Sequence, residues 1–203
     1  MRVVNNSGVA GRKVPPYRTF AGKMAGPDAL VALAQAVRNL PYIQRKLDKN
    51  LIYSVTAGDE SAVKKCLSEG ANPNALDLNG FWTPLFHARE KGHRGIMKIL
   101  ISHGADVDAR DGTGRTVLHH CASHNDAEGA RILLDAGADI DALSDNKTTP
   151  LISACANGHM EMVRFLVSEN AKTVIPGVPP ASYYARINGY PWIVDFLKEH
   201  MQD

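Results

Sequence analysis

The chain has 203 residues, of which 44% are hydrophobic and only 6% aromatic, and its formal net charge is +2. This aromatic content is low for filling one large globular core, but it is sufficient for helices that stack through small residues. No apolar stretch approaches the roughly 18 residues needed to cross a bilayer, and the N-terminus lacks the apolar core of a secretory signal. Membrane insertion and secretion are therefore not expected.

The N-terminal segment, residues 1–26, is predicted to be a disordered basic tail. Residues 1–27 contain five basic side chains and no acidic one, which leaves 18 basic against 21 acidic residues elsewhere. Gly, Asn and Pro are scattered through it without periodicity. It could instead be a mitochondrial targeting segment, although Pro15-Pro16 interrupts any amphipathic helix. Two further alternatives stay open: the tail could be a linear motif that a partner recognises, or a segment that occludes the rest of the chain.

Residues 27–45 are predicted to form two N-terminal capping helices. Asp28 is placed to cap the first helix, which Pro41 is expected to end before opening the second. Apolar residues spaced for one inward face continue through both: Leu30, Leu33, Val37, Leu40, Ile43 and Leu47. We expect this pair to seal one end of a helical stack.

From residue 46 onward the chain repeats itself every 33 or 34 residues. Gly70-Ala71 returns at 104–105, at 137–138 and as Asn170-Ala171, while Thr83-Pro84-Leu85 returns in phase from Thr116 and from Thr149. Each unit is expected to be a helix, a short turn, a second helix and an extended loop. Where glycine is missing from the helix break and the helix end, Asn125 and Asn170 replace it, and asparagine tolerates the left-handed conformation. The sequence therefore predicts an all-α solenoid.

The repeating pattern resembles the ankyrin repeat. The resemblance is carried by Thr116-Val117-Leu118-His119, by Gly104-Ala105-Asp106-Val107-Asp108-Ala109 and by Gly137-Ala138-Asp139-Ile140-Asp141-Ala142. It implies stacked helix-turn-helix units with hairpin-like loops: four repeats over residues 46–176 and a degenerate C-terminal capping repeat over residues 177–203. His119 is the only histidine at its family position, since Phe86 and Ile152 stand at the equivalent places.

The resemblance also implies function, because most ankyrin proteins bind other proteins and catalyse nothing. We expect a non-enzymatic protein-binding adaptor, scaffold or inhibitor that is a monomer on its own and takes no cofactor. Contacts are expected from the concave face of the first helices and from the loop tips, where tryptophan and arginine are frequent anchors. The candidate residues are Trp82, His87, Glu90, Lys91, Arg110, Arg115, His120, Ser123, His124, Thr148, Ser153 and Asn157. The alternative for Trp82 is packing in its own loop, beside Phe81.

The sequence gives weaker evidence for metal binding, for catalysis and for an electrostatic role. His120 and His124 lie four residues apart on one helical face, but two ligands do not make a structural zinc site. Cys121 lacks the pocket and the oriented base that a nucleophile needs. Together with Cys66 and Cys155 it is expected to be a reduced core thiol, which favours an intracellular, chiefly cytoplasmic protein; mitochondria and nucleus stay open. The alternative function is an electrostatic anchor, in which the basic tail binds nucleic acid or an anionic membrane while the repeats recruit a protein.

Overall fold

The computed structural model describes residues 27–200, with side chains from residue 40 onward. Tertiary contacts divide the chain after Pro41, and the unit that begins at Tyr42 forms the stack of repeats. Its helices are α1 (Pro27–Ala57, which crosses that boundary), α2 (Glu60–Ser68), α3 (Pro84–Glu90), α4 (Arg94–Ser102), α5 (Val117–Ser123), α6 (Ala127–Asp135), α7 (Pro150–Ala156), α8 (Met160–Ser168), α9 (Ala181–Ile187) and α10 (Pro191–Glu199). Within the described range no strand forms beyond one antiparallel bridge between Arg110 and Thr116.

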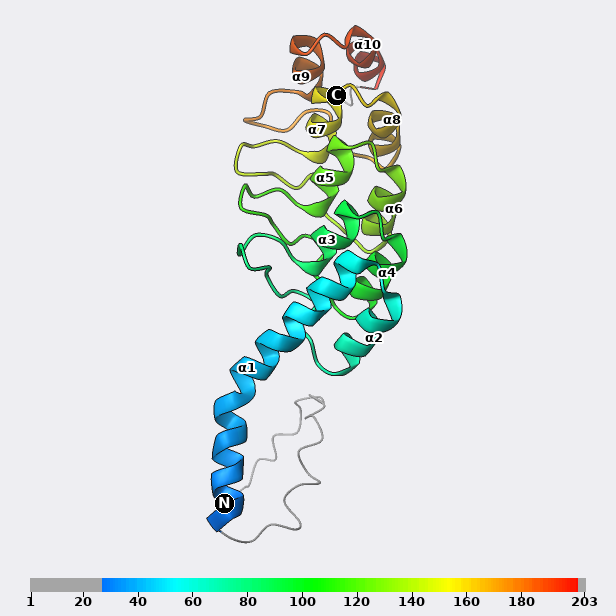
Figure 1. Cartoon of the computed structure of the whole chain (residues 1–203). Coiled ribbons are helices and arrows are strands. Elements are labelled where there is room, and N and C mark those ends of the chain that lie inside the picture. Colours follow the sequence, from blue (N-terminus) through cyan, green and yellow to red (C-terminus); the bar gives the residue numbers. More distant parts are fainter. Residues whose placement is uncertain (1–26, 201–203) are drawn as a thin grey trace, which may run out of the picture. The chain divides into compact units, whose positions relative to one another are not determined.

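The helices stand in two columns (Figure 1). The first helices of the repeats, α3, α5 and α7, follow one another in one column, and the second helices α2, α4, α6 and α8 lie in the other. The loops project from the column of first helices. We call the side built from α3, α5, α7, α9 and these loops the loop face; it corresponds to the concave face expected from the sequence. The all-α repeat architecture predicted from the sequence is confirmed.

The core lies between the two columns and continues from repeat to repeat. Equivalent leucines of the first helices, Leu85, Leu118 and Leu151, are fully buried, as are Leu133 and Leu166 of the second helices. Cys66, Cys121 and Cys155 are buried free thiols among these side chains, as the sequence predicts. A single repeat could not enclose such a core, so each depends on its neighbours.

The turn chemistry also follows the prediction. Asn125 at a helix break and Asn170 at a helix end have φ values of 56° and 67°, in the same left-handed region as Gly92 and Gly104 at the equivalent places. Asparagine takes up this conformation more readily than other side chains, which explains why it replaces glycine here.

The first part of the fold differs from the prediction. The expected pair of capping helices is one continuous helix, α1, with Pro41 inside it. Leu40 and Ile43, expected to face inward, are 51% and 48% exposed, whereas Leu47 packs against the core as expected. Pro41 is itself exposed, so the carbonyl that loses its donor can be hydrated and the helix continues. The tail of residues 1–26 lies outside the described residues, as do the side chains of the predicted stripe before Leu40.

Two kinds of contact tie neighbouring repeats together. In three places a side-chain oxygen near the start of a loop accepts a hydrogen bond from a backbone N–H of the following repeat: Asn74 from Asp106 (2.7 Å), Asp108 from Asp139 (3.0 Å) and Asp141 from Lys172 (2.9 Å). In the first repeat the helical residue Asp48 accepts the corresponding bond from Asn72 (2.8 Å) of the same repeat. On the second helices Arg131 lies 4.9 Å above the Phe165 ring, and Arg164 lies 4.6 Å above Phe196. The interface between repeats is therefore itself a repeating unit.

Candidate protein-binding surface

The bases of two successive loops are each organised by an aspartate that the sequence analysis did not select. Asp111 Oδ1 accepts hydrogen bonds from the backbone N–H groups of Thr113 (2.8 Å) and Arg115 (3.0 Å), and its Oδ2 accepts one from His120 Nε2 at 2.7 Å. Burial alone would raise the pKa of Asp111, but the bonds from His120 and Thr113 lower it to about 2. Burial lowers the pKa of His120, against the opposing effect of Asp111. The carboxylate thus holds the loop and the helix after it together.

Asp77 forms the same arrangement in the preceding repeat, at longer distances. Asp77 Oδ1 accepts from the N–H groups of Asn79 and Phe81, both at 3.2 Å, and Oδ2 lies 3.5 Å from His87 Nε2. That nitrogen is buried and has no hydrogen bond partner. Burial raises the pKa of Asp77, yet the loop N–H groups outweigh it and the pKa is lowered. His87 and His120 are therefore parts of the loop scaffold.

Trp82 packs between these two histidines. Its ring centroid is 5.4 Å from that of His87 and 5.9 Å from that of His120, both in edge-on geometry, and it stacks on Phe86 at 5.9 Å. The packing alternative for Trp82 is therefore the one the structure favours, although its partners are these rings. Phe81 is exposed and lies against Gly112 of the next loop.

The other loop residues are also held by hydrogen bonds. The Arg115 guanidinium donates to Ser123 Oγ and, at 3.3 Å, to the carbonyl of His119. Arg110 is exposed, and its Nη1 donates to the carbonyl of Leu143 at 2.6 Å. Thr148 Oγ1 lies 2.7 Å from Ser144 Oγ, within its own turn. Arg110, Arg115 and Ser123 join neighbouring segments, so their contact roles stay predictions.

The inclusion of Ser153 as a surface contact is wrong. Its side chain is only 7% exposed, and Oγ donates to the Thr149 carbonyl at 3.0 Å. The helix that carries it, α7, packs between α5 and α9, so a small residue on this turn is covered by its neighbours.

Besides Arg110, four predicted residues are exposed: Glu90, Lys91, His124 and Asn157. Lys91, His124 and Asn157 cap the C-terminal ends of α3, α5 and α7 at equivalent positions. Asn157 Nδ2 donates to the Ser153 carbonyl at 2.8 Å and His124 Nδ1 lies 2.9 Å from the His120 carbonyl, while Lys91 has no side-chain hydrogen bond to a described residue. These ends form a row along the loop face whose chemistry changes from repeat to repeat.

The histidines and cysteine considered for metal or catalytic chemistry serve other purposes. His119 is fully buried; its Nδ1 accepts from the Thr116 N–H at 3.1 Å and its Nε2 donates to the Thr148 carbonyl at 2.8 Å. This is the threonine–histidine bond of the family pattern; where Phe86 replaces the histidine, Thr83 Oγ1 is buried without a partner. Burial raises the pKa of the Cys121 thiol to about 12. Among residues 40–200, no group of three or more potential ligands could hold a metal ion.

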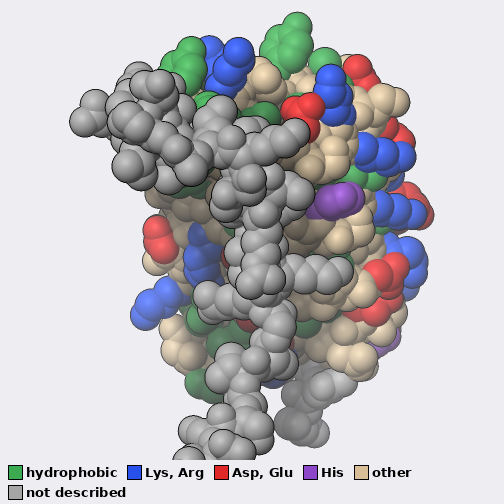
Figure 2. All heavy atoms as spheres, turned by 90° about the horizontal axis from the view of Figure 1, so that it is seen from below, with side chains coloured by type: hydrophobic (Ala, Val, Ile, Leu, Met, Phe, Trp, Pro, Cys, Tyr) green, Lys and Arg blue, Asp and Glu red, His purple; other side chains and the backbone are tan. Residues whose placement is uncertain are grey.

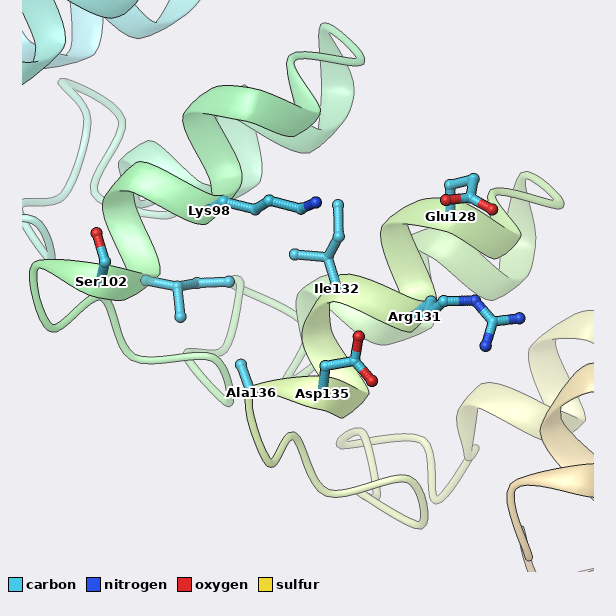
Figure 3. Close-up of a pocket in the computed structure, with 8 residues that line it drawn as sticks. Lys98, Ser102, Glu128, Arg131, Ile132, Asp135 and Ala136 are labelled. Atoms are coloured by element: carbon cyan, nitrogen blue, oxygen red, sulfur yellow. The ribbon is translucent and has the colours of Figure 1, made fainter.

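A shallow depression of about 400 Å³ lies on the opposite side of the stack, between α4 and α6 (Figure 3). Lys98, Glu128, Arg131 and Asp135 line it with charges of both signs, and none of its lining residues is buried. Figure 2, a view of the molecule from below, also shows basic and acidic side chains interspersed along one edge. This side offers neither an enclosed ligand site nor a surface of one charge. None of the described helices is long and apolar enough to span a membrane.

Stacked helix-turn-helix units that carry variable side chains on a constant skeleton define a repeat solenoid of the macromolecule-binding class. Residues 51–144 match the family model described as ankyrin repeats (3 copies), and residues 127–167 match that of ankyrin repeats (many copies). Together these matches span more than half of the chain. The chain belongs to the ankyrin repeat family, and the resemblance predicted from the sequence is confirmed.

Curated relatives match over parts of their length. An ankyrin repeat-containing protein of Schizosaccharomyces pombe is 39% identical over 72 residues, which are 36% of this chain and 34% of the relative. A putative ankyrin repeat protein of Fowlpox virus is 39% identical over 34% of this chain and 37% of its own. The 2-5A-dependent ribonuclease of Mus musculus is 41% identical over 34% of this chain but only 9% of its own length. The chain thus spans well under half of these relatives, and the similarity lies in the repeats.

Proposed function

We propose that this chain is a non-enzymatic adaptor, scaffold or inhibitor that binds another protein with the loop face of its repeat stack. Ankyrin repeats form a protein–protein interaction module, and the family is generally non-catalytic. We propose further that a single protein partner lies across several of the first helices and contacts the loops as well.

The observation that carries this proposal is the row of exposed helix ends at Lys91, His124 and Asn157. The three positions are equivalent, yet they present a cation, an imidazole and an amide. Leu85, Leu118 and Leu151, one helix face away, are identical and fully buried. Side chains that vary while the skeleton is constant are where a solenoid's specificity resides.

The rigid loop bases support the same use. Asp77 and Asp111 fix the loops that lead into the N-terminal ends of α3 and α5, whose C-terminal ends carry Lys91 and His124, through several hydrogen bonds each. A surface that is ordered before binding loses less conformational entropy when a partner docks. The preorganised loops and the row thus lie at the two ends of the same first helices, which a partner laid across these helices would meet together.

The test is affinity purification with mass spectrometry, using the full chain from its native cell type. A triple variant, Lys91→Ala with His124→Ala and Asn157→Ala, should lose a protein that the unaltered chain recovers. The matched control, Lys64→Ala with Lys98→Ala and Glu161→Ala on the second helices, should keep it. Retention by the first variant, or equal loss by both, would place binding elsewhere and refute the proposal.

The proposed setting is the interior of the cell, in keeping with the three free buried thiols. The electrostatic-anchor alternative depends on the basic tail of residues 1–26, which lies outside the described residues, and no observation on the stack favours it.

A further inference from the structure

The described residues that expose large apolar side chains gather at the two ends of the stack. They fall at or before residue 81 and at or after residue 174, with none between. At the N-terminal end Leu78 is 89% exposed and Tyr53 is 75% exposed, and Tyr42 and Leu76 are each more than half exposed. Isolated exposed apolar residues are ordinary, but a group gathered at one end of the stack marks an interaction surface.

The absence of a preceding loop explains this exposure. Tyr53 occupies in α1 the position that His87 and His120 hold in the later repeats, where a loop aspartate covers the ring. Before Tyr53 the chain is helical, so the stretch of α1 around residues 44–48 stands where a loop would be. Gln44 Nε2 donates to the Gly70 carbonyl at 3.1 Å, and Asp48 accepts from Asn72 N–H. This part of α1 therefore lies against the start of the loop that carries Leu76 and Leu78.

Two cations lie on the outer face of this part of α1, opposite the side from which Gln44 and Asp48 contact the loop. Tyr42, Lys46, Lys49 and Tyr53 are spaced four, three and four residues apart and share one face of α1; all four are exposed. Within the described part of the chain neither lysine forms an ion pair. The neighbouring carboxylate of Asp48 is already engaged by Gln44 at 2.8 Å and by Asn72. We define the end patch as Tyr42, Lys46, Lys49, Tyr53, Leu76 and Leu78.

We propose that the end patch docks a segment of another protein in which acidic side chains alternate with large apolar ones. The exposed rings and leucines supply the apolar contact, and the two unpaired lysines select acidic groups by charge complementarity. Tyr42 and Tyr53 have ring faces on which a base could stack, but Leu76 and Leu78 do not and are matched by the apolar side chains of a protein, so we assign the patch to a protein segment. The proposal rests on the proposed protein-binding function and names the chemistry of one partner.

The test selects displayed random peptides on the full chain and measures the affinities of the selected peptides by fluorescence anisotropy. The peptides should be rich in Asp and Glu together with Leu, Phe or Trp. Charge reversal by Lys46→Glu with Lys49→Glu should weaken their binding by about tenfold or more, and Tyr53→Ser with Leu78→Ser by a similar factor. The matched control Lys64→Glu with Lys98→Glu, which makes the same charge change on the second helices, should leave affinity unchanged. All these side chains are exposed, so circular dichroism of each variant should match that of the unaltered chain.

Other outcomes would overturn the proposal. Selected peptides that are neutral or basic, or that bind both charge variants equally, would remove the acidic partner. A single-stranded oligonucleotide that binds the end patch when no peptide does would assign the surface to nucleic acid. Self-association in analytical ultracentrifugation that Tyr53→Ser with Leu78→Ser abolishes would make a second copy the occupant. If the purified partner depends on Lys91, His124 and Asn157 but not on the end patch, the proposed function stands and this inference alone fails.

Discussion

Replacing His119 with glutamine is expected to remove a pH-dependent part of the stability of the stack. The imidazole is fully buried and joins the N-terminus of α5 to the next loop through Thr116 and Thr148. Burial, assisted by the charge of Arg115, lowers the pKa of His119 to about 4 although the bond to Thr148 opposes the shift. A proton on Nδ1 would face the Thr116 N–H, so the folded protein holds the ring neutral.

The magnitude follows from proton linkage. Above the ordinary pKa of 6.5 neither the folded nor the unfolded chain protonates this ring. As the pH falls below that value the unfolded chain takes up a proton while the folded chain does not, so the free energy of unfolding decreases until about pH 4. A difference of 2.5 pKa units corresponds to about 3 kcal/mol. At neutral pH the His119→Gln variant should itself be less stable by about 2–3 kcal/mol, from the disrupted buried hydrogen bonds.

The two stability curves should therefore converge as the pH falls. Urea unfolding followed by circular dichroism, repeated from neutral pH to about pH 4, gives the difference between the unaltered chain and the variant. Contributions from His120 and Asp111 occur in both proteins and largely cancel. Leu133→Ala is the control, since leucine does not titrate and its deficit should be the same at every pH. A difference between the unaltered chain and His119→Gln that stays constant with pH would refute the assignment of a depressed pKa to His119.

Three further changes probe the core, the turns and the thiols. Leu133→Ala should lower the free energy of unfolding by about 2–5 kcal/mol, because the side chain is fully buried and its removal leaves a cavity; a loss below 1 kcal/mol in urea titration would contradict that packing. Asn125→Ala should lower the free energy of unfolding by about 1 kcal/mol, because alanine is strained at a φ of 56°, whereas Asn125→Gly should leave it nearly unchanged. Equal melting temperatures for the two variants would argue against the left-handed turn. Cys121 and Cys155 should resist a thiol reagent in the folded chain, since burial raises both pKa values to about 12, and should react fully in urea; rapid labelling of the native chain, monitored by mass spectrometry, would contradict their burial.

Most of the fold could be predicted from the repeat period, because the repeated glycine, asparagine and threonine residues each favour a turn or a helix end through their own conformational preferences. Asn125 and Asn170 could be placed in left-handed turns from sequence alone, since that conformation is set by the residue itself. The end of the first helix could not be placed in this way. Pro41 disfavours a helix interior, but it is exposed, so water can bond the carbonyl that it leaves without a donor and the helix continues through it.

The candidate surface was harder to predict, because helical register gives the direction of a side chain and says nothing of its neighbours. His87 and His120 were expected to face a partner, yet Asp77 and Asp111 lie close to them from the base of the preceding loop. A signal for this existed: an aspartate stands ten residues before His87 and nine before His120, and the one-residue difference is the insertion near Trp82. Ser153 was misplaced for a similar reason, since its burial comes from the neighbouring helices.

The bonds that tie Asn74, Asp108 and Asp141 each to the next repeat all run in one direction along the chain. A repeat duplicated as a whole between two others would meet a side-chain acceptor on one side and offer its own on the other. A duplication of any other length would break that pairing and leave an amide or a carboxylate without its partner. In evolutionary terms the ladder makes the repeat the natural unit of insertion and deletion, and the array can lengthen or shorten without inventing a new interface.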